Sequence, residues 1–266
     1  MLCFLSLIRW RILFLINGLH FLRGNRDCKM SLETTKDKIV KNNEQISELL
    51  RENEELLREE GFDLPNENFV VGDWYKIKIP SGYIRNTTYF YEKYHLDSIV
   101  KEWQVKANIA YSFQLSDFYN YLFNRFNIWG SVVIIFYKNA IINLVSIFEA
   151  LVLECANNIC EHPSKCQKAT SCKVHFSKDA RNNSYKALAR MNDLGIISYS
   201  EEKMARIKEI IELRNRVHIR LAEKSEFSSA DFCLGLHNEV IALIQELSGA
   251  IYNNGVKLYS CCNQEE

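Results

Sequence analysis

Hydrophobic and polar positions divide the chain into an apolar start, a charged helix, a short extended stretch and a long helical body. Residues 2–22 are apolar, but Arg9 and Arg11 split them, so neither half reaches the ~20 residues that a membrane-spanning helix needs. No small-residue cleavage site follows, and Met30 opens a polar sequence. We therefore expect residues 1–29 to be an apolar, basic leader outside the working protein, with a peripheral membrane anchor as the alternative.

Residues 30–60 are rich in charge and predict one amphipathic helix. Its apolar row has heptad spacing, which is typical of a short coiled-coil seam. The positions of the seam are Leu32, Ile39, Ile46, Leu49, Asn53 and Leu56, with Thr35 and Asn42 in the gaps. The pattern leaves two partners open for this helix, a second protomer or the chain's own bundle.

Residues 61–87 predict an extended linker. Gly61 and Pro65 stop the preceding helix, and the alternating run over residues 74–79, closed by Pro80, is typical of a single strand. The linker separates the charged helix from the main body of the chain.

Residues 88–254 predict a helical bundle, and residues 255–266 a tail. Three prolines and ten glycines in the whole chain leave long stretches free to form helices. The predicted elements are one long or two shorter aromatic helices over residues 88–126, a central buried helix over 130–158, and helices over 185–194, 200–220 and 229–252. Gly195 ends one of these helices, and Ser200 and Ser228 are the expected N-caps of the last two. The fold class is therefore all-α, with an N-terminal helical appendage and a short extended segment.

The charge of the chain is balanced, with 33 basic and 33 acidic residues. Because five of the bases and one of the acids lie in residues 1–30, the remainder carries 28 bases and 32 acids. This excludes a protein that binds nucleic acid through its overall charge. Nine cysteines without regular spacing indicate a reducing compartment, so we expect a cytoplasmic protein.

A local basic patch lies between Lys165 and Arg190, in the connection before the helix over residues 185–194 and within that helix. Its members are Lys165, Lys168, Lys173, Lys178, Arg181, Lys186 and Arg190, against the single acid Asp179. Such a patch can bind an RNA backbone without reading its sequence, and the alternative is a solvated loop. The same connection holds Cys160, His162, Cys166, Cys172 and His175. No C-x₂-C pair is present, so we expect reduced thiols and no metal there, with a zinc site as the alternative.

Polar residues also interrupt the most apolar helix. Asn139, Asn143, Ser146 and Glu149 advance by three or four positions along the helix over residues 130–158 and form a polar stripe. The stripe needs polar partners if it is buried, and is otherwise a solvent-facing edge.

Two charged residues fall on the apolar face of the predicted helix over residues 200–220. At 100° per residue, Arg214 and His218 continue a face of apolar residues, namely Met204, Ile207, Ile210, Ile211 and Val217. Burying a guanidinium without a partner is costly. The sequence leaves three partners open: Glu149, a partner subunit or a bound phosphate.

The segment Glu-Leu-Arg-Asn-Arg-Val-His over residues 212–218 resembles the HEPN superfamily, whose mark is an arginine, often followed by asparagine, and a histidine a few residues later. The surroundings are similar as well: an apolar helix containing residues 146–150, then residues 187–197, then the Arg-Asn helix and a closing helix. The resemblance covers about residues 88–252. Three residues separate Arg214 from His218, and HEPN ribonucleases usually have a longer spacing.

The resemblance implies a HEPN-like bundle and a metal-independent endoribonuclease that works as a homodimer, with two copies of the helix forming one cleft. In that chemistry His218 relays a proton, Arg214 grips the phosphate, Asn215 orients, and Glu149 holds one of the two ionic side chains. The basic patch would guide RNA towards the cleft, and no cofactor or metal is expected. The alternative is a non-catalytic HEPN-like scaffold that binds a partner protein, in which Arg214 and Glu149 form a buried structural pair.

Overall fold

The computed structural model describes residues 35–61, 77–78, 82–128, 130–159, 175–215 and 232–255. The chain divides into two compact units, Met1–Lys78 and Ile79–Glu266, and this boundary falls inside the linker predicted over residues 61–87. The described residues form helices and connecting loops, without a strand among them, so the all-α class is confirmed. The leader over residues 1–29, most of the linker and the tail lie outside the described residues.

In the first unit, the helix predicted for residues 30–60 is present over residues 35–59. Side chains within it form ion pairs along one face, because Arg51 reaches Glu48 at 2.6 Å and Glu55 at 2.8 Å. The predicted strand is described only at residues 77–78, which have no regular secondary structure.

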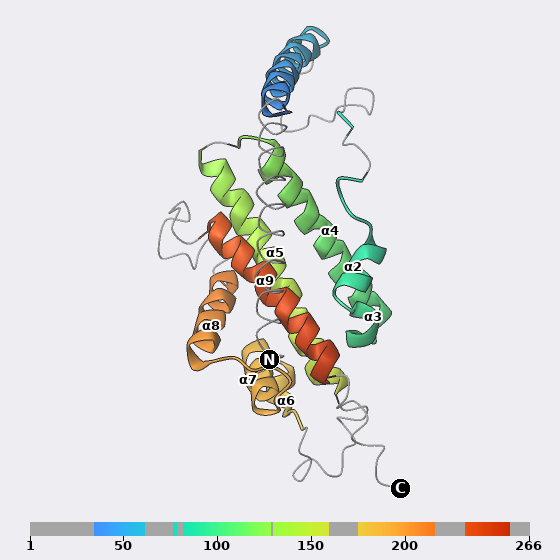
Figure 1. Cartoon of the computed structure of the whole chain (residues 1–266), viewed down its shortest axis with the longest axis vertical. Coiled ribbons are helices and arrows are strands. Elements are labelled where there is room, and N and C mark those ends of the chain that lie inside the picture. Colours follow the sequence, from blue (N-terminus) through green and yellow to red (C-terminus); the bar gives the residue numbers. More distant parts are fainter. Residues whose placement is uncertain are drawn as a thin grey trace, which may run out of the picture. The chain divides into compact units, whose positions relative to one another are not determined.

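Eight α-helices make up the described part of the second unit (Figure 1). They are α2 (Thr87–Lys93), α3 (Leu96–Ile99), α4 (Trp103–Arg125), α5 (Ser131–Asn158), α6 (Lys178–Arg181), α7 (Ser184–Asp193), α8 (Glu201–Asn215) and α9 (Leu234–Ala250), with one π-helical turn at Ile251–Gly255. In Figure 1, α4, α5 and α9 run along the length of the bundle, and α6, α7 and α8 lie beside one end of it.

Helix α5 is the centre of the bundle, as its apolar sequence predicts. It packs against α4, α7, α8 and α9, and most of its apolar residues from Ala140 to Ala156 are buried in the core. The prediction of a buried helix is wrong for its first turns, because Val132 and Ile135 are exposed. Among the described helices, α5 alone has the length and apolar composition of a membrane span, and its buried half shows that the same composition serves the core.

The polar stripe of α5 finds polar partners in its buried half. Asn143 donates to the Ser112 carbonyl oxygen at 2.7 Å and to the Ser116 hydroxyl at 2.9 Å, both on α4. Asn139, nearer the start of the helix, is exposed. The stripe is therefore a solvent-facing edge at one end and an interhelical contact further along.

The aromatic segment over residues 88–126 forms three helices rather than the one or two predicted. His95 has a positive φ of 53°, which ends α2 because non-glycine residues rarely continue a helix in that region. Its ring stacks on Tyr252, with the ring centroids 4.0 Å apart. The sequence prediction missed the break because no proline or glycine marks it.

The predicted capping residues are found at the end of α7 and at the start of α8, but not at the start of α9. Gly195 follows α7 with a φ of 71°, as its predicted stop role requires. The Ser200 hydroxyl accepts from the Lys203 backbone N–H at 3.2 Å, as predicted. The predicted start of the last helix near Ser229 is wrong: residues 232–233 are bends, and α9 begins at Leu234 with Cys233 as its N-cap.

Candidate functional site

A pocket of about 740 Å³ opens between α5, α7 and α8. Its walls carry the last two polar residues of the α5 stripe, Ser146 and Glu149, together with residues 182–186 and the C-terminal half of α8. The volume lies within the ~300–1,000 Å³ of small-molecule pockets in proteins. The pocket is therefore large enough for a nucleotide-sized group.

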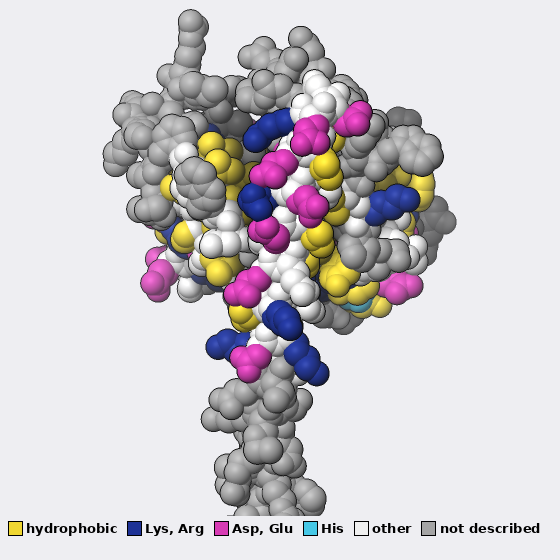
Figure 2. All heavy atoms as spheres, turned by 90° about the horizontal axis from the view of Figure 1, so that it is seen from above, with side chains coloured by type: hydrophobic (Ala, Val, Ile, Leu, Met, Phe, Trp, Pro, Cys, Tyr) yellow, Lys and Arg dark blue, Asp and Glu magenta, His cyan; other side chains and the backbone are white. Residues whose placement is uncertain are grey.

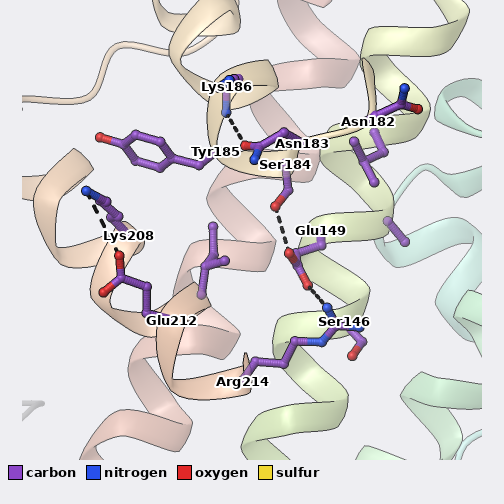
Figure 3. A pocket seen from close by; sticks show the side chains of 13 residues that line it. Ser146, Glu149, Asn182, Asn183, Ser184, Tyr185, Lys186, Lys208, Glu212 and Arg214 are labelled. Atoms are coloured by element: carbon purple, nitrogen blue, oxygen red, sulfur yellow. Dashed lines mark hydrogen bonds and ion pairs between the residues drawn. The ribbon is translucent and has the colours of Figure 1, made fainter. Parts of the chain in front are cut away.

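Glu149 is the central side chain of this pocket (Figure 3). One carboxylate oxygen accepts a hydrogen bond of 2.7 Å from the Ser184 hydroxyl, and the other lies 3.1 Å from Nη1 of Arg214. Glu149 is on α5, Ser184 is the first residue of α7, and Arg214 is near the end of α8. One carboxylate thus connects three helices.

Local sequence explains why these groups meet. The Asn183 side chain accepts from the Lys186 backbone N–H at 3.0 Å and so caps α7, which begins at Ser184. Ser184 is buried at this helix start, where its hydroxyl faces α5. Glu149 belongs to the polar stripe, and the apolar residues on either side of the stripe fix its direction.

Arg214 is less buried than the sequence predicts. Its side chain is 42% exposed, whereas that of Glu149 is 14% exposed. The ion pair therefore lies at the edge of the pocket rather than in the core, and the expectation of a fully buried guanidinium is wrong. The helix face that is buried at Ile207 and Ile211 reaches the rim of the pocket at Arg214, where solvent has access to the guanidinium. Glu149, one of the three partners that the sequence left open, forms an ion pair with Arg214 at 3.1 Å.

The two lysines that line the pocket also meet carboxylates. Lys208 lies 4.0 Å from Glu212, with its ammonium group 5.9 Å from the centre of the Tyr185 ring. Lys186 pairs with Asp179. Each basic side chain in the described lining of the pocket therefore has an acidic neighbour, and the pocket is close to electrically neutral.

The remaining predicted site residues are only partly described. Asn215 is the last residue of α8, and its side chain lies outside the described part, as do the whole of His218, Lys165, Lys168 and Lys173. Lys178 and Arg181 lie on α6, exposed and half-buried respectively. Arg181 directly precedes the pocket residues Asn182 and Asn183, so α6 brings part of the predicted basic patch to the pocket edge.

Sequence reasoning missed several pocket residues, among them Ser184, Lys208 and Glu212. Lys208 and Glu212 carry a recognisable signal, because they lie four residues apart on the helix that bears Arg214 and form an i,i+4 ion pair. Ser184 has no such signal, since only the fold brings it within reach of a residue 35 positions earlier.

No cluster of three or more potential metal ligands occurs within the described residues. His175 is the one member of the predicted Cys/His set in that part of the chain, where its carbonyl oxygen accepts from Arg190 at 3.1 Å. Cys160, His162, Cys166 and Cys172 lie outside it.

Comparison of the chain with protein-family models gives no match, and comparisons with curated proteins and with solved structures give no match either.

Proposed function

We propose that this chain is a HEPN-like, metal-independent endoribonuclease whose site is the pocket between α5, α7 and α8. The observation that supports the proposal best is the position of Arg214, which is held 3.1 Å from a carboxylate and is still 42% exposed. A guanidinium held in this way is oriented without being enclosed, and its remaining N–H donors suit the oxygens of a phosphodiester.

His218 supplies the acid–base step in this proposal. It accepts the proton of the ribose 2′-hydroxyl while the 2′-oxygen attacks phosphorus, and the bond from phosphorus to the 5′-oxygen breaks. The leaving 5′-oxygen takes a proton from the second histidine of a homodimer or from water, and a 2′,3′-cyclic phosphate remains. Arg214 neutralises charge on the phosphate, and Asn215 orients the reacting group. We place this homodimer in the cytoplasm, with RNA as its substrate.

The proposal is tested by incubating the purified full-length chain with single-stranded RNA in the presence of EDTA. We expect cleavage products that end in a 2′,3′-cyclic phosphate, and no cleavage of the 2′-deoxy analogue. His218→Ala should lower the rate at least ~100-fold, because a positioned acid or base typically contributes ~10²–10⁴-fold.

Arg206→Ala is the matched control for Arg214→Ala. Arg206 lies on the same helix and pairs with Glu239 at 2.9 Å, away from the pocket. Arg214→Ala should lose most of the cleavage rate and Arg206→Ala should keep it. If wild type and His218→Ala cleave RNA equally fast, the activity comes from elsewhere and the proposed site is wrong.

A non-catalytic scaffold is the second candidate, supported by the way Glu149 connects α5, α7 and α8. In this case Arg214 and Glu149 hold the bundle together for a partner protein. The expected result is a lower melting temperature of Arg214→Ala and no RNA turnover by either protein. An unchanged melting temperature in that variant would exclude the structural role.

A further inference from the structure

The helix over residues 35–59 carries an apolar row on its surface. The members of the row are Ile39 (53% exposed), Ile46 (51%), Leu49 (58%) and Leu56 (51%). In Figure 2 hydrophobic side chains form a row along one side of a charged ridge on this helix. Most of the stability of a helix in a protein comes from packing its apolar face, so the exposed row indicates a partner that covers it.

Two asparagines complete the heptad positions of this row. From Ile39 onward, after Leu32 and Thr35, the predicted seam has six residues, in order Ile39, Asn42, Ile46, Leu49, Asn53 and Leu56. The pattern is apolar, Asn, apolar, apolar, Asn, apolar, and it reads the same from both ends. A seam with this symmetry is complementary to itself when two copies run in opposite directions.

The antiparallel register gives each of these six residues a matching partner. Ile39 lies opposite the partner subunit's Leu56, and Ile46 lies opposite the partner subunit's Leu49. Asn42 meets the partner subunit's Asn53, where each amide can donate to and accept from the other. The pair then has six layers, four apolar and two of paired amides, and no asparagine is left facing an apolar side chain.

The charges of the helix favour the antiparallel direction over the parallel one. Its first two turns hold three lysines and one aspartate, namely Lys36, Lys38, Lys41 and Asp37, and its last two turns hold Glu52, Glu54, Glu55, Glu59 and Arg58. Lysines at the N-terminus and glutamates at the C-terminus oppose the dipole of an isolated helix. In an antiparallel pair, the basic end of each copy lies beside the acidic end of the other.

One flanking ion pair follows from this register. Lys38 and Glu59 occupy positions beside the seam, and the antiparallel register brings Lys38 next to the partner subunit's Glu59, twice by symmetry. In a parallel pair the corresponding neighbours are Lys38 with Asn43 and Glu52 with Leu57, which provide no opposite charges. The outer face needs no partner, because Arg51 already pairs with Glu48 and Glu55 within the helix.

We propose that residues 35–59 are a dimerisation surface, on which the same helix of a second copy binds antiparallel about a two-fold axis. A two-fold interface uses the same patch on both subunits, as this self-complementary seam requires. The inference does not depend on ribonuclease activity, because it rests on the first unit alone and its test measures association.

The test uses two full-length variants, Lys38→Glu and Glu59→Lys. Each alone places like charges at both flanking positions and should dimerise about tenfold more weakly at low salt. Mixed together, the two variants form a heterodimer in which both positions again carry opposite charges. We expect sedimentation equilibrium to show the wild-type dissociation constant for the mixture.

Lys41→Glu and Glu44→Lys are the control pair, since they make the same charge changes on the outer face of the helix. Alone or mixed, they should leave the dissociation constant within about twofold of wild type. A mixture of Lys38→Glu and Glu59→Lys that associates no better than either variant alone would overturn the antiparallel assignment. A wild-type chain that stays monomeric at high micromolar concentration would overturn the dimer.

A second measurement locates the contact directly. Positions 38 and 59 are 21 steps apart, about 32 Å along one helix, so a zero-length carbodiimide link between Lys38 and Glu59 requires two copies. Crosslinking a mixture of ¹⁴N- and ¹⁵N-labelled protein should yield that peptide pair with mixed isotopes. Its absence, with other Lys–Glu links formed, contradicts the proposal.

Discussion

The contact between Glu149 and Arg214 can be tested quantitatively by a double-mutant cycle with Glu149→Gln and Arg214→Met. Glu149→Gln keeps the shape of the side chain, Arg214→Met keeps its apolar stem, and both remove the charge, so the cycle isolates the ion pair. Glu149 is 14% exposed and Arg214 42% exposed, so their contact at 3.1 Å lies between a buried and a surface ion pair. We expect a coupling free energy of about 1 kcal/mol. This is the upper limit of the ~0.2–1 kcal/mol range of most exposed pairs.

The single variants differ in what they leave behind. Arg214→Met leaves the Glu149 carboxylate with the Ser184 hydroxyl as its described donor, and should cost about 1–2 kcal/mol of unfolding free energy. Glu149→Gln keeps an acceptor for Ser184 and releases a guanidinium that water can reach, so it should cost less. Urea unfolding followed by circular dichroism at constant m-value measures both.

Lys208 and Glu212 supply the control cycle in the same pocket. They lie 4.0 Å apart on α8, and both side chains are more than half exposed. Their coupling should be about 0.3–0.5 kcal/mol. If the Glu149–Arg214 coupling is no larger than this control, the carboxylate does not fix the arginine, and the argument for an oriented guanidinium at the pocket edge is refuted.

Three further predictions concern other parts of the chain. Asp117→Ala should lower the free energy of unfolding by about 3 kcal/mol, because this buried carboxylate accepts from the backbone and guanidinium of Arg85. The control Asp97→Ala removes an exposed ion pair with Lys106 and should cost under about 1 kcal/mol, and urea titration measures both variants. Burial lowers the pKa of His237, so its contribution to stability is complete above the unfolded pKa near 6.5 and is lost as pH falls below that value. In His237→Phe the melting temperature should therefore change less between pH 7 and pH 5 than in wild type. Asn42→Leu should weaken an antiparallel dimer by leaving Asn53 of the partner subunit opposite leucine, and would strengthen a parallel one, as sedimentation can show.

Helix existence was predictable from sequence, and helix ends were predictable only where a capping residue marks them. Ser200 and Gly195 act as their types predict, since a serine hydroxyl and a positive φ are local properties. The start of α9 was placed near Ser229 because serine is a good cap, but the helix starts at Leu234 behind Cys233, which makes no side-chain cap bond. Tertiary packing decides such a boundary, and the sequence does not reveal it.

The candidate site was predictable where a polar or charged residue interrupts the apolar face of a helix, and unpredictable where a contact depends on how the helices pack. The stripe on α5 and the face of α8 identified Glu149 and Arg214, which form the ion pair found at the pocket. The exposure of Arg214 was misjudged, because a helical wheel treats this face of α8 as buried along its whole length. Ser184 was missed since its role depends on the position of α7 relative to α5.

The charge balance of the pocket has different consequences for the two functions proposed for it. Arg214, Lys186 and Lys208 each have a carboxylate neighbour, so the described lining offers an RNA phosphate little net attraction. A ribonuclease at this site must therefore draw most of its affinity from bases beside the pocket, which the segment over residues 165–181 supplies in sequence. A phosphate that reaches Arg214 then competes with Glu149 for the guanidinium. It binds more tightly than the carboxylate only if it accepts two parallel hydrogen bonds, because Glu149 makes one contact with Arg214. A scaffold needs no further ligand in this pocket, because each of these three basic side chains already pairs with a carboxylate.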